Sequence, residues 1–405
     1  MAADLETRLM GHLEHLCVEI GPRPVGSIAN QEAAGYIRCV LEASGLEVEM
    51  QEFPCPLWEE IDTHLQVGEE KLIAAANTFS PPCDATAPAV VMGTVAELEA
   101  AELRGHIGVM YGELTKDTGL GSRRAAHFPE RAQKIVRLLE EKRPAALITV
   151  NPKTGCLERL IRDWEFPIPS ATVPAEAGLV LLRHSDERLH LRIDSRQSPS
   201  HFSSVIAVKT GARQERIALL AHFDTMANTP GASDNGSGVA VLLALAETLA
   251  QKDLAAGLEW IVVNGEENGG LGDAEYMRRQ EGELERILAV INVDGAGQRL
   301  GANNVTVMNA SQSLQDQVRQ IHERYPGVAW AAPWYGSDHS AFLSRGVPCI
   351  PIGSGSGANI GHLSSDTVEW ISPAKLNEVV SLIADIVESL QDRSAEWCRL
   401  PSQGA

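Results

Sequence analysis

The chain has 405 residues, of which 44% are hydrophobic, and its 34 basic and 54 acidic residues give a formal net charge of -20. This length predicts two or three domains, and this hydrophobic content is sufficient for buried cores. The negative charge argues against a nucleic-acid or anionic-membrane partner, because the chain has no basic field that would release counterions. No apolar run reaches the roughly 18 residues of a membrane span.

The N-terminus and the cysteines predict a cytoplasmic location. Residues 1–16 carry acidic side chains early and have no continuous apolar segment of the kind found in signal peptides. The seven cysteines are scattered singly, at positions 17, 39, 55, 83, 156, 349 and 398. Single cysteines favour reduced thiols over a disulfide framework and argue against a zinc site built from thiolates.

The first residues of the chain predict two helices and a strand. Apolar residues recur at helical spacing over residues 4–20, and the Gly-Pro-Arg-Pro segment 21–24 ends this helix. A second helix is predicted over residues 30–44 and a strand over residues 47–53, with Gly45 between them. We interpret this section as a layer that packs against a sheet.

Residues 56–198 differ from the rest of the chain in their pattern of predicted elements. Short apolar strands are predicted at residues 89–92, 107–111 and 146–150, around one amphipathic helix at residues 130–141. No motif that combines paired acids with histidine is apparent in this stretch, and its isolated histidines include His106, His127, His184 and His190. An isolated histidine is more often a surface or core residue than a ligand. We therefore predict an inserted β-rich domain that takes no part in the chemical step.

Beyond residue 198 the chain predicts an α/β fold. Short runs rich in Val, Ile and Leu are typical of buried strands, and they lie at residues 204–209, 217–221, 258–263 and 287–293. Helical patterns lie at 239–250, behind Ser237 as a candidate cap, at 271–280, at 311–325 and from Ser372-Pro373 onward. This alternation predicts a mostly parallel sheet with helices on both faces, in which the site lies beyond the carboxyl ends of the strands.

Polar residues of the kind that bind zinc follow three of these strands. They are His222 and Asp224, Glu266 and Glu267, and Asp294. Imidazole nitrogens and carboxylate oxygens bind Zn²⁺ where no thiolate is offered, and Asp224 is placed to hydrogen-bond the far nitrogen of the His222 ring and fix its tautomer. One of the two adjacent glutamates can bind metal while the other acts as a general base.

Two further residues would complete a site for two metal ions. Asp234, in the segment Ser-Asp-Asn-Gly-Ser-Gly at 233–238, would bridge the ions, and His362 would add a second imidazole. Each motif alone is weak, since an Asp-Asn-Gly segment is most often a turn, but all of them fall on one side of one sheet. The glycine-rich segment 353–357 lacks the following helix and the lysine of a phosphate-binding loop, so we interpret it as a flexible wall beside His362.

The ordered motifs resemble the co-catalytic dizinc aminopeptidase family, the twenty-eighth metallopeptidase family, which also contains glutamate carboxypeptidases and the non-enzymatic transferrin receptors. The motifs are His-Phe-Asp-Thr at 222–225, Gly-Ala-Ser-Asp-Asn-Gly-Ser-Gly-Val-Ala at 231–240, Gly-Glu-Glu at 265–267, Asn-Val-Asp at 292–294, Ser-Asp-His-Ser-Ala-Phe at 337–342 and His-Leu-Ser-Ser-Asp-Thr at 362–367. Residues 21–27 resemble the family's N-terminal signature. The resemblance implies a catalytic domain of zinc-exopeptidase (phosphorylase/hydrolase-like) fold over residues 1–55 and 199–405.

The resemblance also implies a cofactor and roles for the site residues. Two Zn²⁺ ions are implied, with other divalent ions as an alternative. One ion is assigned to His222, Asp234 and Glu267, and the other to Asp234, Asp294 and His362. Glu266 is assigned as the general base towards a water that bridges the metals. A cis peptide bond is implied between Asp234 and Asn235.

The insert and the Ser-Asp-His element carry looser resemblances. Segments 105–111, 143–149 and 168–173 resemble a protease-associated domain. Relatives with such an insert are often exported, so export is an alternative to the cytoplasm.

The tyrosine that stabilises the oxyanion in this family lies just before the Ser-Asp-His element, where this chain has Trp334 and Tyr335. We expect these two residues to contact substrate, and Ser337, Asp338 and His339 to support the site from behind.

These features predict a zinc-dependent aminopeptidase that acts on peptides. Four carboxylates and two Zn²⁺ ions give a nearly neutral site that admits a free α-amine, whereas a C-terminal carboxylate requires a cationic clamp, for which Arg299 and Arg345 are the nearest candidates. A carboxypeptidase or a dipeptidase is the alternative. A receptor-like member would have lost ligands, and the bridging segment of glutaminyl cyclases typically lacks the form seen at 234–238. A homo-oligomer is left open.

Overall fold

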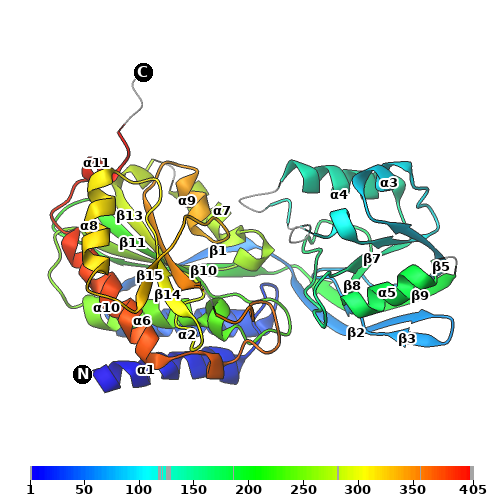
Figure 1. The fold of residues 1–405 in the computed structure, drawn as a ribbon, viewed down its shortest axis with the longest axis horizontal. Helices are drawn as coiled ribbons and strands as arrows, with labels where there is room; N and C mark the ends of the chain where they lie inside the picture. Colours follow the sequence, from blue (N-terminus) through cyan, green and yellow to red (C-terminus); the bar gives the residue numbers. More distant parts are fainter. Residues whose placement is uncertain are drawn as a thin grey trace. The chain divides into compact units, whose positions relative to one another are not determined.

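The computed structural model describes residues 2–116, 120, 122–124, 129–185, 187–280, 282–355 and 357–401. The chain divides into two compact units, shown in Figure 1. Met1–Phe53 and Phe202–Ala405 form unit 1, and Pro54–His201 form unit 2. The sequence predicts the insert at residues 56–198, a few residues inside the limits of unit 2.

Unit 1 is built on an eight-stranded mixed sheet with the strand order β1-β10-β12-β11-β13-β16-β14-β15. Its strands are β1 (Glu47–Pro54), β10 (His201–Lys209), β11 (Arg216–His222), β12 (Gly257–Val263), β13 (Ile287–Val293), β14 (Ala302–Val305), β15 (Val328–Trp330) and β16 (Cys349–Gly355). The central strands β12, β11, β13 and β16 are parallel, whereas β10 and β14 run antiparallel to β12 and β16. Every residue of β12 and β13 is buried, as expected for strands covered on both faces.

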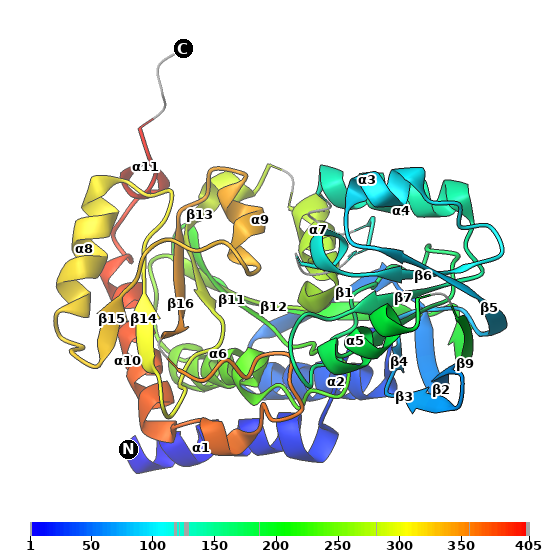
Figure 2. The ribbon, with the colours of Figure 1, turned by 45° about the vertical axis from the view of Figure 1, so that its right-hand side comes forward.

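Helices cover both faces of this sheet, so the predicted α/β fold is confirmed. The helices are α1 (Ala2–Glu14), continued by a π-helical segment (His15–Ile20), α2 (Ile28–Ala43), α6 (Ser237–Leu249), α7 (Leu271–Arg279), α8 (Gln312–His322), α9 (His339–Leu343), α10 (Pro373–Ser389) and α11 (Ala395–Cys398). Residues of α1, α2, α6, α8 and α10 share one core with the sheet, and residues of α7 and α9 share another. Figure 2 shows α6 and α9 on opposite sides of the strands.

Helix α6 begins earlier than predicted and without the predicted cap. The segment from Val239 to Ala246 is fully buried, which explains why the sequence is apolar almost all round this helix. Ser237 is the first helical residue, Gly236 occupies the cap position, and the Ser237 hydroxyl donates to the carbonyl of Ser233 at 3.0 Å. Ser237 is therefore not the N-cap, because its backbone is already helical.

Unit 2 also contains an eight-stranded sheet, with the order β3-β2-β9-β5-β6-β7-β8-β4. Its strands are β2 (Leu57–Val67), β3 (Glu70–Leu72), β4 (Ala75–Ala76), β5 (Cys83–Met92), β6 (Ile107–Met110), β7 (Ala146–Val150), β8 (Ser170–Val173) and β9 (Arg188–Ser198). Its helices are α3 (Val95–Ala100), α4 (Glu130–Lys142) and α5 (Ala175–Arg183), where the sequence predicts only α4.

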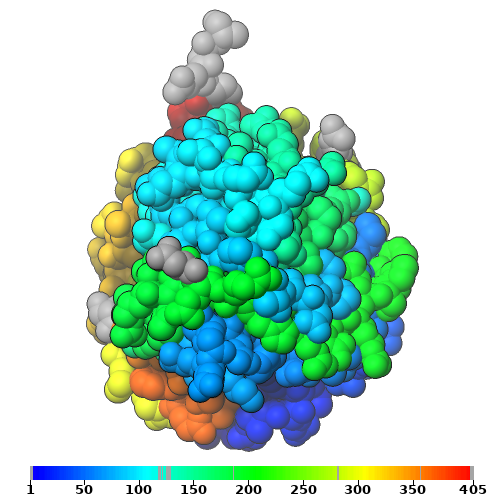
Figure 3. All heavy atoms as spheres, turned by 90° about the vertical axis from the view of Figure 1, so that its right-hand side faces the viewer, coloured from blue at the N-terminus to red at the C-terminus, as the bar shows by residue number. Residues whose placement is uncertain are grey.

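The two helices that the prediction missed are short. Helix α3 has six residues, too few for a periodic signal, and it is set by a capping box in which Thr94 and Glu97 bond each other's backbone. Leu98 of α3 and Leu139 of α4 lie fully buried in one core beside β6 and β7. The part of the chain that holds α3 and α4 appears in cyan and teal on the face shown in Figure 3. None of the described helices is long and apolar enough to cross a membrane.

Candidate active site

Three neighbouring strands end side by side where the candidate residues lie. In the parallel pairs, His222 of β11 is opposite Val263 of β12, and Leu220 of β11 is opposite Asn292 of β13. The loops that follow these strands therefore begin at one edge of the sheet, where sites form in α/β folds. These loops carry the polar residues that the sequence predicts at this edge.

Asp234 reaches the same edge from the loop before α6. Its peptide bond to Asn235 is cis, as the family resemblance implies. The Asn235 side chain is fully buried, donates to the carbonyl of Val293 at 2.8 Å and accepts from the backbone N–H of Gly238 at 3.0 Å. Asn235 thereby ties the Asp234 loop to the end of β13, directly before Asp294.

Asp366 holds the Asp234 loop from the other side. Its two carboxylate oxygens accept from the backbone N–H groups of Ser233 at 2.7 Å and Asp234 at 3.0 Å, and its side chain is fully buried. The same segment supplies His362, whose left-handed backbone (φ 64°) is sparsely populated by residues other than glycine. Asp366 is not predicted as a site residue from the sequence, because its partners are backbone groups that a sequence does not reveal.

The five candidate metal ligands come together as two sets that share Asp234. In each set the ligand atoms lie within 4.8 Å of one another, and the sets are His222, Asp234 and Asp294, and Asp234, Glu267 and His362. His222 Nε2 lies 3.3 Å from Asp234 Oδ1 and 3.6 Å from Asp294 Oδ1. His362 Nε2 lies 3.3 Å from Asp234 Oδ2 and 3.2 Å from Glu267 Oε2. Asp234 therefore presents one oxygen to each set.

The division of ligands drawn from the resemblance differs from the grouping in the structure. It pairs Glu267 with His222 and Asp294 with His362, whereas the structure pairs His222 with Asp294 and Glu267 with His362. Strand order alone permits either pairing, because β11 lies between β12 and β13. The side-chain positions decide it, since His222 Nε2 lies 3.6 Å from Asp294 Oδ1. Glu267 lies on the far side of Asp234, within reach of His362.

The environment of His222 fits a cation between the carboxylates. His222 is 1% exposed, and its Nε2 makes no hydrogen bond although two carboxylate oxygens lie within 3.6 Å. Burial opposes a charge on the ring, but the carboxylates of Asp224, Asp234 and Asp294 outweigh it and hold the pKa of His222 well above its ordinary value. The buried imidazole is thus faced by three carboxylates, an environment that suits a divalent ion.

Asp224 supports the site, but not in the way the sequence predicts. The nearest contact of His222 Nδ1 is the backbone carbonyl of Asp224 at 3.2 Å, and the Asp224 carboxylate lies 3.7 Å away. That carboxylate instead accepts from the backbone N–H groups of Glu266 at 3.1 Å and Glu267 at 3.2 Å. Asp224 therefore fixes the loop that carries the two glutamates as well as facing the imidazole.

Glu266 lies beside the two ligand sets and belongs to neither. The Glu266 side chain is partly exposed, but protein atoms surround it closely. Burial raises the pKa of Glu266 well above its ordinary value; the nearby His222 lowers this pKa, and the neighbouring Glu267 raises it further. A carboxylate that binds protons more tightly than usual is suited to general-base chemistry near neutral pH.

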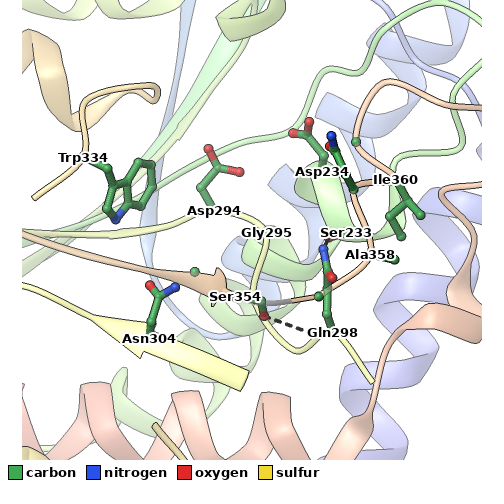
Figure 4. Close-up of a pocket in the computed structure, with 14 residues that line it drawn as sticks. Ser233, Asp234, Asp294, Gly295, Gln298, Asn304, Trp334, Ser354, Ala358 and Ile360 are labelled. Carbon is green, nitrogen blue, oxygen red and sulfur yellow. Dashed lines mark hydrogen bonds between the residues drawn. The ribbon is translucent and has the colours of Figure 1, made fainter. Parts of the chain in front are cut away.

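A pocket of about 450 Å³ adjoins the ligand sets. Asp234 and Asp294 form part of its lining together with Ser233, Gln298, Asn304 and Trp334, and Figure 4 shows Trp334 and Asn304 on the Asp294 side and Ile360 on the Asp234 side. None of the described residues that line the pocket is a lysine, arginine or histidine.

Comparison with known proteins agrees with this geometry. Residues 204–387 match the model described as Peptidase family M28. Over these residues the chain is similar to peptidase family M28. Aminopeptidase YwaD of Bacillus subtilis is 24% identical over 390 residues, 93% of this chain and 82% of that protein, and a probable leucine aminopeptidase of Arthroderma benhamiae is 28% identical over 46% of this chain and 57% of that protein.

Solved structures show the same fold over nearly the whole chain. An aminopeptidase from Aneurinibacillus sp. strain AM-1 has a TM-score of 0.72 at 23% identity and covers 98% of this chain and 94% of its own. BSAP, a zinc aminopeptidase from Bacillus subtilis, has a TM-score of 0.77 at 21% identity and covers 98% of both chains. At these identities the likeness establishes the fold alone.

The residues around the Ser-Asp-His element lie in different environments. Trp334 lines the pocket, whereas Tyr335 is 68% exposed and is not part of its lining. His339 is fully buried, with Nε2 2.8 Å from the carbonyl oxygen of Trp334 and Nδ1 3.1 Å from Nδ2 of Asn292. Asp338 is also buried, at 3% exposure. Trp334 is thus the residue of this group that lies where a substrate would bind.

Four histidines of unit 2, His106, His127, His184 and His190, are expected to be dispensable for the reaction. The metal-type clusters found among the described residues both lie in unit 1, while His106, His184 and His190 bond to Arg104, Glu187 and Asp84 in unit 2. His127 lies outside the described residues. Alanine at each of the four positions should leave turnover of a small substrate unchanged, as measured on variants whose circular dichroism matches the wild type. Loss of turnover in a folded variant would place unit 2 in the chemical step.

Proposed function

We propose that this chain is a zinc-dependent aminopeptidase, which removes residues from the N-terminus of peptides. The observation that carries the proposal is the pair of ligand sets that share Asp234, with Glu266 beside them. Similar proteins support the proposal, since they include an aminopeptidase of Bacillus subtilis and BSAP, which is described as a zinc aminopeptidase.

The candidate ligand residues suit zinc in their number and in their chemical type. His222, Asp234 and Asp294 would hold one ion, and Asp234, Glu267 and His362 the other. Imidazole and carboxylate ligands in groups of three leave the open position that a catalytic zinc needs. When bound, two zinc ions supply Lewis acidity and lower the pKa of coordinated water.

Glu266 is the chain's own proton carrier in this proposal. Its carboxylate takes a proton from the water that attacks the scissile carbonyl carbon and returns it to the nitrogen of the departing peptide. Asp224 fixes the backbone of Glu266 through its N–H group, so the carboxylate stays oriented while the proton moves. The adjoining pocket would receive the side chain of the first substrate residue.

Charge decides which end of the peptide is read. Asp234, Glu266, Glu267 and Asp294 bring about four negative charges against about four positive ones on two zinc ions, so a free α-amine meets no repulsion. A C-terminal carboxylate would require a cationic clamp. The two arginines nearest in sequence bond elsewhere, Arg299 to the carbonyls of Glu369 and Ile371 and Arg345 to that of Ala341.

Blocking the amine of the substrate tests this assignment. Leucyl-anilide should be hydrolysed, and the same compound acetylated on its amine should be cleaved at least about 100-fold more slowly, because it loses an interaction of a few kcal/mol with the site. The two rates are measured on one zinc-loaded preparation. Undiminished cleavage of the acetylated compound would favour a carboxypeptidase or another peptidase of the family.

We also propose a domain type for the insert and a cellular location for the protein. The insert at 56–198 is proposed to be a protease-associated-like domain, on the basis of its three short resembling segments. A cytoplasmic location is proposed because the seven cysteines are single in the sequence and free in the structure. Cell fractionation decides between the cytoplasm and export.

A further inference from the structure

Three of the loops that carry candidate ligands attach to one short segment near the N-terminus. This segment, residues 23–30, lies between the π-helical segment and the first turns of α2, and we call it the anchor segment. It contributes no ligand and does not line the pocket. Its contacts nevertheless reach the loops after β11 and β12 and the loop before α6.

Arg23 makes the first of these connections. Its guanidinium donates to the carbonyls of Phe223 at 2.6 Å, Pro230 at 2.7 Å and Gly231 at 3.1 Å, and its backbone N–H donates to the Thr225 hydroxyl at 2.9 Å. Phe223 directly follows His222, and Gly231 lies in the loop that presents Asp234. One side chain thus fixes both ends of the connection between two ligands.

The chemistry of Arg23 suits this task. The residue is fully buried, and no ion pair joins it to a carboxylate of the described residues, so its charge is spread over backbone carbonyl oxygens that also include those of Leu16 and Gly21. Only arginine offers five donors in a rigid planar fork, whereas lysine offers three from a single point.

Asn30 makes the connection to the third loop. Its side-chain amide pairs with that of Asn264 in both directions, at 2.9 Å and 2.8 Å, and both side chains are fully buried. Asn30 Nδ2 also donates to the carbonyl of Arg23 at 2.9 Å. Asn264 follows the end of β12 and precedes the loop of Glu266 and Glu267.

We propose that Arg23 and Asn30 are positioning residues, which set the placement of His222, Asp234 and the Glu266–Glu267 loop relative to one another. Ligands on separate loops need common support, because a metal site tolerates errors of only about 0.5 Å in the position of its ligands. Groups that hold ligands from behind typically change metal affinity by about 10–100-fold when they are removed.

The test replaces the amide of Asn30 and measures zinc as well as turnover. Asn30→Leu and the milder Asn30→Ser should weaken zinc binding by about 10-fold or more, as measured by chelator competition. They should also alter the visible absorption of the Co²⁺-loaded protein, which reports ligand geometry. Turnover of leucyl-anilide should fall mainly through a lower kcat. Only this measurement rests on the proposed function. If the wild type did not cleave leucyl-anilide at all, the zinc and Co²⁺ measurements would still test the proposal.

Asn77→Leu is the matched control. Asn77 is a fully buried asparagine of unit 2 that accepts from Leu160, Ile161 and Thr172, and these partners all lie in unit 2. This variant should lose stability in the metal-free state but keep the zinc affinity and Co²⁺ spectrum of the wild type.

Two results would overturn the proposal. One is an Asn30 variant that loses stability in the metal-free state as the control does, yet keeps zinc affinity and the Co²⁺ spectrum. The other is a failure of Asn30→Leu, Asn30→Ser and the double variant Asn30→Leu/Asn264→Leu all to fold, because the double variant removes both buried amides together and leaves neither unpaired. That outcome would assign the pair to the fold and not to the site.

Discussion

Replacement of Glu266 by glutamine is expected to lower turnover of leucyl-anilide by about 100-fold or more, while zinc content stays near that of the wild type. Glutamine keeps the size and the hydrogen-bonding reach of the side chain but cannot take up a proton. Zinc is retained because Glu266 belongs to neither ligand set. Steady-state kinetics and metal analysis on the same preparation measure both quantities.

Glu267→Gln is the informative partner of this variant. Glu267 Oε2 lies 3.2 Å from His362 Nε2 in the set that also contains Asp234, so its replacement should reduce zinc content as well as turnover. The two glutamates are adjacent in sequence and differ in their distance to the ligand sets, which makes each a control for the other. Equal loss of zinc in the two variants would contradict the division of roles.

Removal of the metal is expected to lower the melting temperature of the protein, and Asp234→Asn should remove most of this dependence. Each ion bound only by the folded state stabilises it by about 2.7 kcal/mol at a free concentration 100 times its Kd. For a domain of this size, that corresponds to a shift of about 5–10 °C for each ion. Because Asp234 offers one oxygen to each set, its replacement weakens both sites together.

The measurement compares melting curves with a chelator and with added zinc. Asp316→Asn serves as the control, because Asp316 is an exposed residue of α8 whose side chain accepts only from Gln312 in the same helix. The control should keep the full zinc-dependent shift. A shift of wild-type size in Asp234→Asn would show that zinc stabilises the protein at another place.

The fold was predictable where burial requires a recognisable pattern of apolar residues in the sequence. Strands covered on both faces need apolar side chains at every position, so the runs at 217–221, 258–263 and 287–293 predict β11, β12 and β13 to within one residue at each end. The start of α6 was less predictable, because the turn that contains Asp234 replaces an ordinary cap. Helix α3 escaped prediction because six residues carry too little periodicity.

The composition of the site was more predictable than its internal arrangement. Residues that follow parallel strands must meet at one edge, so the sequence indicates that His222, Glu267 and Asp294 gather there. Strand order does not decide which of them face each other, because β11 lies between β12 and β13. That depends on how the loop side chains are directed, which residue spacing does not reveal.

The supporting residues were the least predictable part of the site. Arg23, Asn30 and Asp366 act through backbone carbonyls, backbone N–H groups or a distant amide. Their partners lie up to 234 positions away along the chain, as in the Asn30–Asn264 pair. A local sequence pattern does not predict such contacts.

The most direct test of the account is the location of the metal ions in a zinc-loaded crystal by anomalous scattering. The account predicts two ions about 3.5–4 Å apart, bridged by the carboxylate of Asp234. His222 and Asp294 should bind one ion, and Glu267 and His362 the other. A single ion bound away from Asp234 in a metal-replete crystal would contradict it.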